Sequence, residues 1–166
     1  MTSLPRPSAR RRRPCRPGAV VAAPVAALAV LAVAGCGSAV DVPAAEGAAD
    51  PGCAEVLVLL RDVDELAGLP RVPTTGQSTA AWASDDRSTR VELRCGVELP
   101  APTTDACVTV DGVDWVTADE QGSPPFTTYG RAPATRVDVT GDVTAGDVLP
   151  GLAGAVGALE AQRACV

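Results

Sequence analysis

The chain has 166 residues, with 20 acidic residues, 14 basic residues that are all Arg, and neither His nor Lys. Without His there is no imidazole to activate a serine or cysteine nucleophile or to bind a metal, and without Lys there is no P-loop and no Schiff base. The net charge of −6 argues against nucleic-acid binding, which requires a basic surface, and the length predicts one domain.

Residues 1–35 are predicted to be a secretory signal. Residues 1–17 hold six of the 14 Arg and no acid, and residues 18–34 are an uncharged stretch rich in Ala, Val and Leu. A basic start, a short apolar stretch and small residues at the cleavage site define such a signal. The sequence Val33-Ala34-Gly35-Cys36 resembles the lipobox of bacterial lipoproteins, in which the signal is removed before an acylated Cys.

Two other interpretations of this segment are an uncleaved transmembrane helix and an ordinary secretory signal with an unmodified Cys36. The apolar run contains Pro24 and is shorter than the roughly 20 residues that span a membrane. The Arg run at residues 10–13 also permits twin-arginine export, so the export route stays open. We expect Cys36 to carry palmitate or a similar acyl group and to hold the chain on the extracytoplasmic face of the cell membrane.

Residues 36–50 are predicted to be the lipidated Cys and a flexible tether. The stretch after Cys36 is rich in Ala, Gly and Pro, carries three acids and has no apolar periodicity, which is typical of a disordered spacer. As a coil it would span roughly 20 Å. Residues 51–166 are then expected to form a single domain.

The pattern of residues 51–166 predicts an α+β fold. Asp50 and Pro51 mark a helix start. Alternating apolar residues predict strands at residues 89–97, 106–110, 113–117, 127–129 and 135–140, with a further edge strand around 80–83. Asp111-Gly112 is a hairpin turn, and apolar spacing from Leu149 to Leu159 predicts a second helix. The expected architecture is an N-terminal helix, a four- to five-stranded mostly antiparallel sheet and a C-terminal helix, in a small disulfide-stabilised domain.

Four cysteines remain in the mature domain once Cys15 leaves with the signal and Cys36 is acylated. Four cysteines in an oxidising compartment allow three sets of disulfides. We favour Cys53–Cys165, which would tie the start of the domain to its end, and Cys95–Cys107, which would close a loop between two strands. In the chain-entropy model, a disulfide that closes a long loop raises the free energy of unfolding by roughly 3–5 kcal/mol. The spacing contains no Cys-x-x-Cys, so no metal site and no cofactor is expected.

Several blocks of the chain resemble a family of actinobacterial lipoproteins, domain of unknown function 3515. The blocks are Asp50-Pro51 with Cys53, Leu93-Arg94-Cys95-Gly96, Cys107 with Gly112-Val113-Asp114-Trp115, Phe126-Thr127-Thr128-Tyr129-Gly130-Arg131, and Arg163-Ala164-Cys165, together with Cys36. The resemblance covers nearly all of residues 36–166. It implies a cell-envelope lipoprotein and supplies neither an activity nor a catalytic residue.

Carboxylates are the remaining candidates for acid–base chemistry. Two clusters are present: Asp62, Asp64 and Glu65, and Asp138, Asp142 and Asp147. A glycosidase needs two carboxylates about 5–10 Å apart, and the chain has only four aromatic residues to hold a sugar. Neither cluster has the spacing of a calcium loop. A small envelope hydrolase using an Asp/Glu pair is therefore the alternative to a non-enzymatic binding or accessory module.

Trp115, Tyr129 and Arg131 are the best candidates for a partner surface, because aromatic and Arg side chains anchor interfaces. The competing interpretation places Trp115 in the core. Removal of the signal leaves 8 Arg against 20 acids, so the net charge becomes −12. This charge favours cationic partners. The expected partners are the membrane, through the lipid anchor, and an envelope protein or small ligand, but no nucleic acid.

Overall fold

The computed structural model of the chain describes residues 38–117 and 124–165. The predicted signal peptide and Cys36 lie outside these residues. The chain divides into two units, residues 1–34 and 35–166, and the fold described below belongs to the second. Within the described ranges, no helix combines the length and the apolar character needed to cross a membrane.

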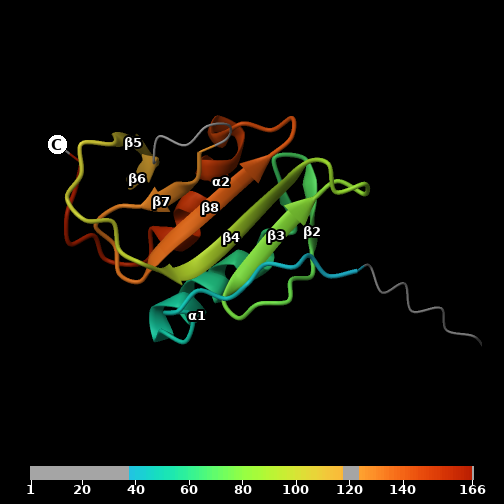
Figure 1. The fold of residues 1–166 in the computed structure, drawn as a ribbon, viewed down its shortest axis with the longest axis horizontal. Coiled ribbons are helices and arrows are strands. Elements are labelled where there is room, and N and C mark those ends of the chain that lie inside the picture. Colours follow the sequence, from blue (N-terminus) through green and yellow to red (C-terminus); the bar gives the residue numbers. More distant parts are fainter. Residues whose placement is uncertain (1–37, 118–123, 166) are drawn as a thin grey trace, which may run out of the picture. The chain divides into compact units, whose positions relative to one another are not determined.

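The second unit is built on an open, eight-stranded antiparallel sheet (Figure 1). The spatial order is β1-β2-β3-β4-β8-β7-β6-β5, so β1 and β5 are the two edges. The longest pairing joins β4 to β8 at the centre, with seven residue pairs and a shift of register between Cys95 and Val97. The strands are β1 (Glu65–Leu66), β2 (Leu69–Val72), β3 (Thr79–Ala83), β4 (Arg90–Val97), β5 (Ala106–Val110), β6 (Val113–Thr117), β7 (Phe126–Thr128) and β8 (Ala134–Thr140).

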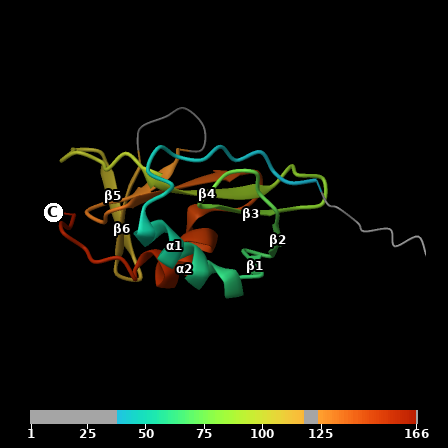
Figure 2. The same ribbon diagram turned by 90° about the horizontal axis from the view of Figure 1, so that it is seen from below.

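Both helices lie on one side of the sheet (Figure 2). They are α1 (Pro51–Leu59), which continues into the 3-10 helix η1 (Leu60–Asp62), and α2 (Ala145–Val156). The Asp50 carboxylate accepts a hydrogen bond of 2.8 Å from the Gly52 N–H at the start of α1, and Thr144 and Asp147 form a capping box at the start of α2. Each cap satisfies backbone N–H groups that have no partner within the helix.

The hydrophobic core fills the space between the helices and this face of the sheet. Trp82 and Trp115 are its largest fully buried side chains, and the Trp82 indole N–H donates to the Val63 carbonyl oxygen at 2.9 Å. Aliphatic residues from both layers surround them: Val56, Leu60, Val91, Leu93, Val137, Val148, Leu149 and Leu152. One buried face therefore explains the apolar alternation along β4, whereas all five residues of β3 are buried.

The predicted α+β architecture is wrong. The sheet has eight strands rather than four or five, and the two short helices that precede and follow most of it in the chain both pack on one of its faces. Two of the additional strands, β1 and β2, form a hairpin in which Ala67 and Gly68 both adopt positive φ in a tight turn. The strand β2 tolerates Pro70 because it pairs there only with a two-residue edge strand. The helix α2 ends at Val156, before Leu159.

Residues 38–49 form an N-terminal strap that packs on the domain, on the opposite side of the sheet from the helices (Figure 2). Val42 is fully buried in it and Ala48 nearly so. The Val40 N–H donates to the Pro73 carbonyl oxygen at 2.8 Å, and the Gly47 N–H donates to the Gly96 carbonyl oxygen at 2.9 Å. Gly96 has φ of +89°, and a side chain there would collide with the Gly47 backbone.

The prediction of a flexible tether is therefore wrong for residues 38–50. The strap has no apolar periodicity because it forms neither a helix nor a long strand. It is held instead by two buried side chains, by backbone hydrogen bonds and by the close approach of two glycines, and none of these leaves a repeating pattern in the sequence.

We expect Val42→Asp to release the strap from the sheet. A buried carboxylate without a partner is costly, but the strap can detach while the sheet stays folded, which limits the loss of unfolding free energy to about 2 kcal/mol. Hydrogen–deuterium exchange should then rise over residues 38–48. Ala44→Asp places the same charge on an exposed strap residue and should change neither quantity. Equal exchange in the two variants would contradict a docked strap.

Candidate functional site

The three residues predicted to form a partner surface do not lie together on the surface. Trp115 is fully buried in the core, and Arg131 is only 8% exposed. The Arg131 guanidinium donates to the carbonyl oxygens of Gly112, Gly157 and Leu159. These contacts join the β5–β6 turn to the end of α2. The prediction of a partner surface is therefore wrong at Trp115 and Arg131, and only Tyr129 remains half-buried at the surface.

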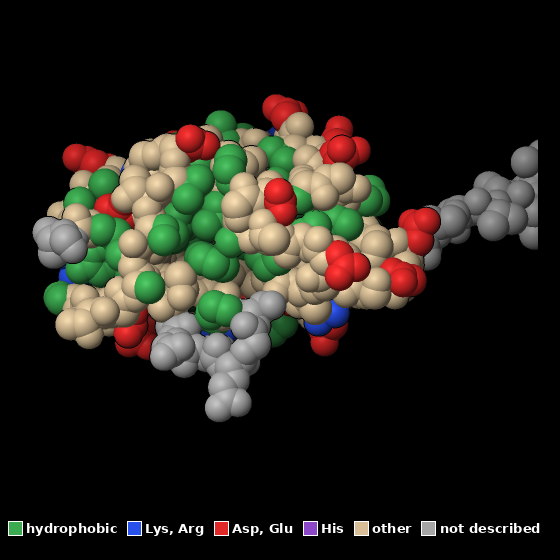
Figure 3. All heavy atoms as spheres, turned by 90° about the horizontal axis from the view of Figure 1, so that it is seen from above, with side chains coloured by type: hydrophobic (Ala, Val, Ile, Leu, Met, Phe, Trp, Pro, Cys, Tyr) green, Lys and Arg blue, Asp and Glu red, His purple; other side chains and the backbone are tan. Residues whose placement is uncertain are grey.

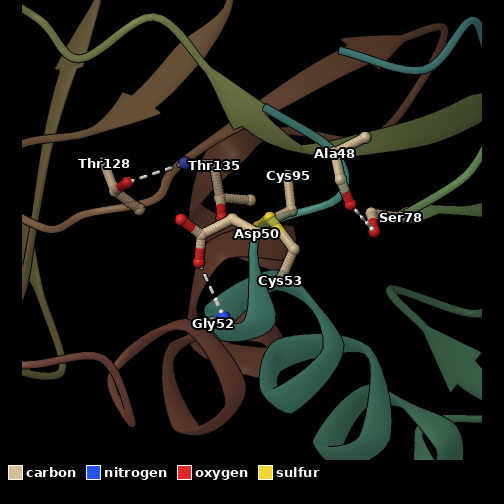
Figure 4. Close-up of a disulfide and its surroundings, with 8 residues drawn as sticks. All are labelled: Ala48, Asp50, Gly52, Cys53, Ser78, Cys95, Thr128 and Thr135. Carbon is tan, nitrogen blue, oxygen red and sulfur yellow. Dashed lines mark hydrogen bonds between the residues drawn. A yellow bond between two sulfur atoms is a disulfide. The ribbon is translucent and has the colours of Figure 1, made fainter. Parts of the chain in front are cut away.

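The four cysteines of the described residues pair as Cys53–Cys95 and Cys107–Cys165, with Cα–Cα distances of 5.5 and 6.2 Å. The predicted pairs Cys53–Cys165 and Cys95–Cys107 are wrong. Strands β4 and β5 follow one another in the sequence, but β8, β7 and β6 lie between them in the sheet. Cys95 consequently lies over α1, where it meets Cys53 (Figure 4).

The second disulfide borders a small cleft, which we call the disulfide cleft. Its volume is about 280 Å³, and it is lined by Thr103, Thr104, Asp105, Cys107, Val116, Tyr129, Ala164 and Cys165. The Asp114 carboxylate stabilises one wall by accepting hydrogen bonds from the Thr109 hydroxyl at 2.6 Å and the Cys165 N–H at 2.8 Å. The guanidinium of Arg163 lies 5.8 Å from the centre of the Tyr129 ring. The cleft offers one exposed carboxylate, an aromatic ring and hydroxyl groups.

A second, more open cleft of about 690 Å³ lies between the strap and β4. Its lining consists of Ala45, Glu46, Gly47, Arg94, Gly96, Val97 and Glu98. Arg94 forms an ion pair of 2.7 Å with Asp138, which also pairs with Arg136 at 2.8 Å. Partial burial alone would raise the pKa of Asp138, but the hydrogen bonds from Arg136 and Arg94 outweigh it and hold this pKa below its usual value.

The carboxylates considered for hydrolysis have other roles or are exposed. Asp138 is held by two Arg, and Asp147 caps α2, where the Thr144 hydroxyl lowers its pKa. Asp62, Asp64 and Glu65 are exposed at η1 and β1, and Asp142 is exposed after β8. Sequence reasoning missed Glu46 and Glu98, which line the open cleft, because their proximity depends on docking of the strap. Both are exposed, whereas a general acid needs an enclosed, partly desolvated site.

In the described part of the chain, no three His, Cys, Asp or Glu residues lie close enough together to hold a metal ion. The charged side chains are mainly acidic instead: on the face that Figure 3 presents, scattered acidic side chains and few basic ones surround hydrophobic side chains that run across its middle. Most Arg side chains of the domain contact a ring, a carbonyl oxygen or a carboxylate of the domain itself. Arg71 stacks on Trp82, Arg87 donates to the Ser38 carbonyl oxygen, and Arg90 pairs with Glu92.

Comparison with known proteins gives one match. A family model described as a protein of unknown function, DUF3515, matches residues 18–164. No curated protein and no solved structure matches the chain.

Proposed function

Because the chain belongs to the DUF3515 family of proteins of unknown function, we propose that it is a secreted, lipid-anchored protein of an actinobacterial cell envelope and acts there as a non-enzymatic binding module. The observation that carries this proposal is that all four cysteines of the described residues are joined in disulfides. Such bonds persist in oxidising compartments and are rare in a reducing cytoplasm. The resemblance of residues 33–36 to a lipobox supports attachment through an acyl group on Cys36.

The strap determines how far the domain would lie from the membrane. Its first described residue, Ser38, is held by Arg87, whose guanidinium donates to the Ser38 carbonyl oxygen at 2.8 Å. Only Gly37 separates Ser38 from Cys36. Two residues span at most about 7 Å, so an acyl group on Cys36 would hold the domain at the lipid surface rather than on a tether of about 20 Å. The connection between β3 and β4 would then be the end nearest the membrane.

A binding role is supported by the distribution of charge. Residues 36–166 carry 20 acids and 8 Arg, and most of these Arg are already engaged by carboxylates, carbonyl oxygens or rings within the domain. The unpaired carboxylates are therefore the charges available to a partner, and they favour a cationic one. Neither of the carboxylate clusters considered for hydrolysis forms a facing pair in an enclosed cleft, so the proposal is a binding module rather than a hydrolase.

Cys36→Ser is expected to abolish incorporation of labelled palmitate and to release the protein from the membrane fraction, because the thiol that would carry the lipid is removed. The experiment uses a bacterial host that processes lipoproteins and follows both the label and the membrane-bound fraction. Cys15→Ser is the matched control, since Cys15 would leave with the signal and its loss should change neither readout. Labelling and membrane retention that persist in Cys36→Ser would overturn lipid anchoring at this residue.

A further inference from the structure

Strand β5 has a free edge. It is the last strand of the sheet, and within residues 38–117 and 124–165 it pairs only with β6. Ala106, Val108 and Thr109 are exposed, and Val108 keeps 41% of its surface accessible to solvent. An edge strand presents a row of backbone N–H and C=O groups to which another extended chain can hydrogen-bond.

This edge lacks the features that usually prevent pairing with another chain. Proteins protect edge strands with Lys, with Pro, with bulges or by making them very short. The other edge, β1, has only two residues. In contrast, β5 reads Ala-Cys-Val-Thr-Val, contains no charge and no Pro, and keeps an unbroken register with β6 over five residue pairs. Its composition has high β-propensity.

The free edge is also held rigidly. Cys107, in the middle of β5, is bonded to Cys165, and Thr109 donates to Asp114 on β6 at 2.6 Å. An edge that is already fixed loses little conformational entropy when a partner binds. The disulfide cleft adjoins β5 on the side of the sheet away from the core, because Cys107 and Val116 line it whereas their neighbour Trp115 points into the core.

Charge at the two ends of β5 selects the occupant. Asp105 precedes the strand and Asp111 follows it, and both are exposed. If a second copy of this chain paired antiparallel about Val108, Asp105 of each copy would lie opposite Asp111 of the other. Like charges directly opposite each other in a sheet are destabilising. An extended segment with basic residues would be attracted at the same two positions.

We propose that β5 is a docking strand to which an extended, basic segment of another envelope protein adds as a ninth strand. Backbone hydrogen bonds to the outer side of β5 supply the binding energy, and alternate side chains supply specificity. On one side of the sheet these side chains cover Val108; on the other, a Lys or Arg enters the disulfide cleft beside the exposed carboxylate of Asp105. This inference rests on the proposed function, since it names the partner of that binding module.

The test uses the full chain in detergent micelles and a synthetic nine-residue peptide that alternates Lys with Val or Thr. The peptide should bind and should slow hydrogen–deuterium exchange over residues 106–110. Two matched peptides are controls: one with N-methylated alternate amides, which keeps every side chain but removes backbone donors, and one with Glu in place of Lys. Neither should bind. Binding of the N-methylated peptide with equal affinity, or binding without protection of β5, would overturn the proposal.

Two variants locate the site on the protein. Val108→Lys places a positive charge on the β5 edge, where it repels the Lys residues of the peptide, and should weaken peptide binding at least about tenfold. Val58→Lys is the matched control, because Val58 is 53% exposed on α1 and its replacement should leave affinity unchanged. Equal effects of the two variants would contradict a site at β5.

Failure of the lipid anchor and failure of the docking strand give different results. Absence of palmitate labelling in the wild-type chain would overturn the lipid anchor alone, whereas failure of the peptide to bind an anchored chain would overturn the docking strand alone.

Discussion

Replacing both Cys53 and Cys95 with Ala is expected to lower the free energy of unfolding by about 4 kcal/mol. The bond closes a loop of 42 residues, and its loss frees the unfolded chain to adopt many more conformations. In the folded state it joins α1 to β4, and both cysteines are fully buried (Figure 4). Urea unfolding of the oxidised protein and the double variant, monitored by Trp fluorescence, measures the difference.

The second disulfide provides the comparison. Its loop of 58 residues is longer, so loop entropy alone would predict a slightly larger loss on its removal. Both Cys107 and Cys165 are only half-buried, however, and Cys165 lies in the tail that follows α2. Without the bond this tail can move while the sheet stays folded. The native state then gains conformational entropy too, which offsets part of the loss of stability. We expect about 2 kcal/mol for Cys107→Ala with Cys165→Ala, and a loss equal to that of the first pair would contradict this account.

Local signals in the sequence were sufficient for several short elements. Asp50 identifies the start of α1 because its carboxylate caps the helix by accepting a hydrogen bond from Gly52, only two residues further along the chain. Asp111 and Gly112 identify the β5–β6 turn because both residues adopt the positive φ that a two-residue hairpin requires. Such features depend on nearest neighbours alone, so one sequence is enough to predict them.

The strand order could not be predicted in the same way. The strand β8 pairs with β4 although more than 30 residues separate them, and its insertion moves β5 to the far edge of the sheet. The incorrect pair Cys95–Cys107 depends on this strand order, because it assumes that strands adjacent in the sequence are adjacent in the sheet; the incorrect pair Cys53–Cys165 assumes instead that the two ends of the domain meet. The strap is a further case, since Val42 is the only large apolar side chain that it buries and a single residue has no period.

The candidate site was also misjudged for a physical reason. Arg131 and Trp115 have the composition of an interface, but the sequence does not show that the carbonyl oxygens at Gly112, Gly157 and Leu159 converge on one point. A buried guanidinium that meets three such oxygens joins distant segments of the chain. The free edge of β5 was hidden for a related reason: whether a strand has one neighbour or two depends on the order of the whole sheet.

Arg131→Met is expected to lower the free energy of unfolding by about 3 kcal/mol. Methionine retains most of the apolar stem but leaves three carbonyl oxygens without their donor. Hydrogen bonds from a charged group contribute about 1.5–3 kcal/mol each. The total is reduced here because the exposed turn at Gly112 can exchange its lost partner for water. Urea unfolding gives the loss, and hydrogen exchange should rise over residues 157–165, where the tail follows α2.

Two further variants distinguish a structural role from a partner contact at this residue. Arg61→Met makes the same change at an exposed position on η1 and should alter stability by less than about 0.5 kcal/mol. Arg131→Lys keeps the charge but not the planar fork that reaches several oxygens at once, so it should restore only part of the loss. If Arg131→Met were as stable as the unmodified protein, the contacts with the α2 end would contribute nothing, and the residue would again be a candidate for binding a partner.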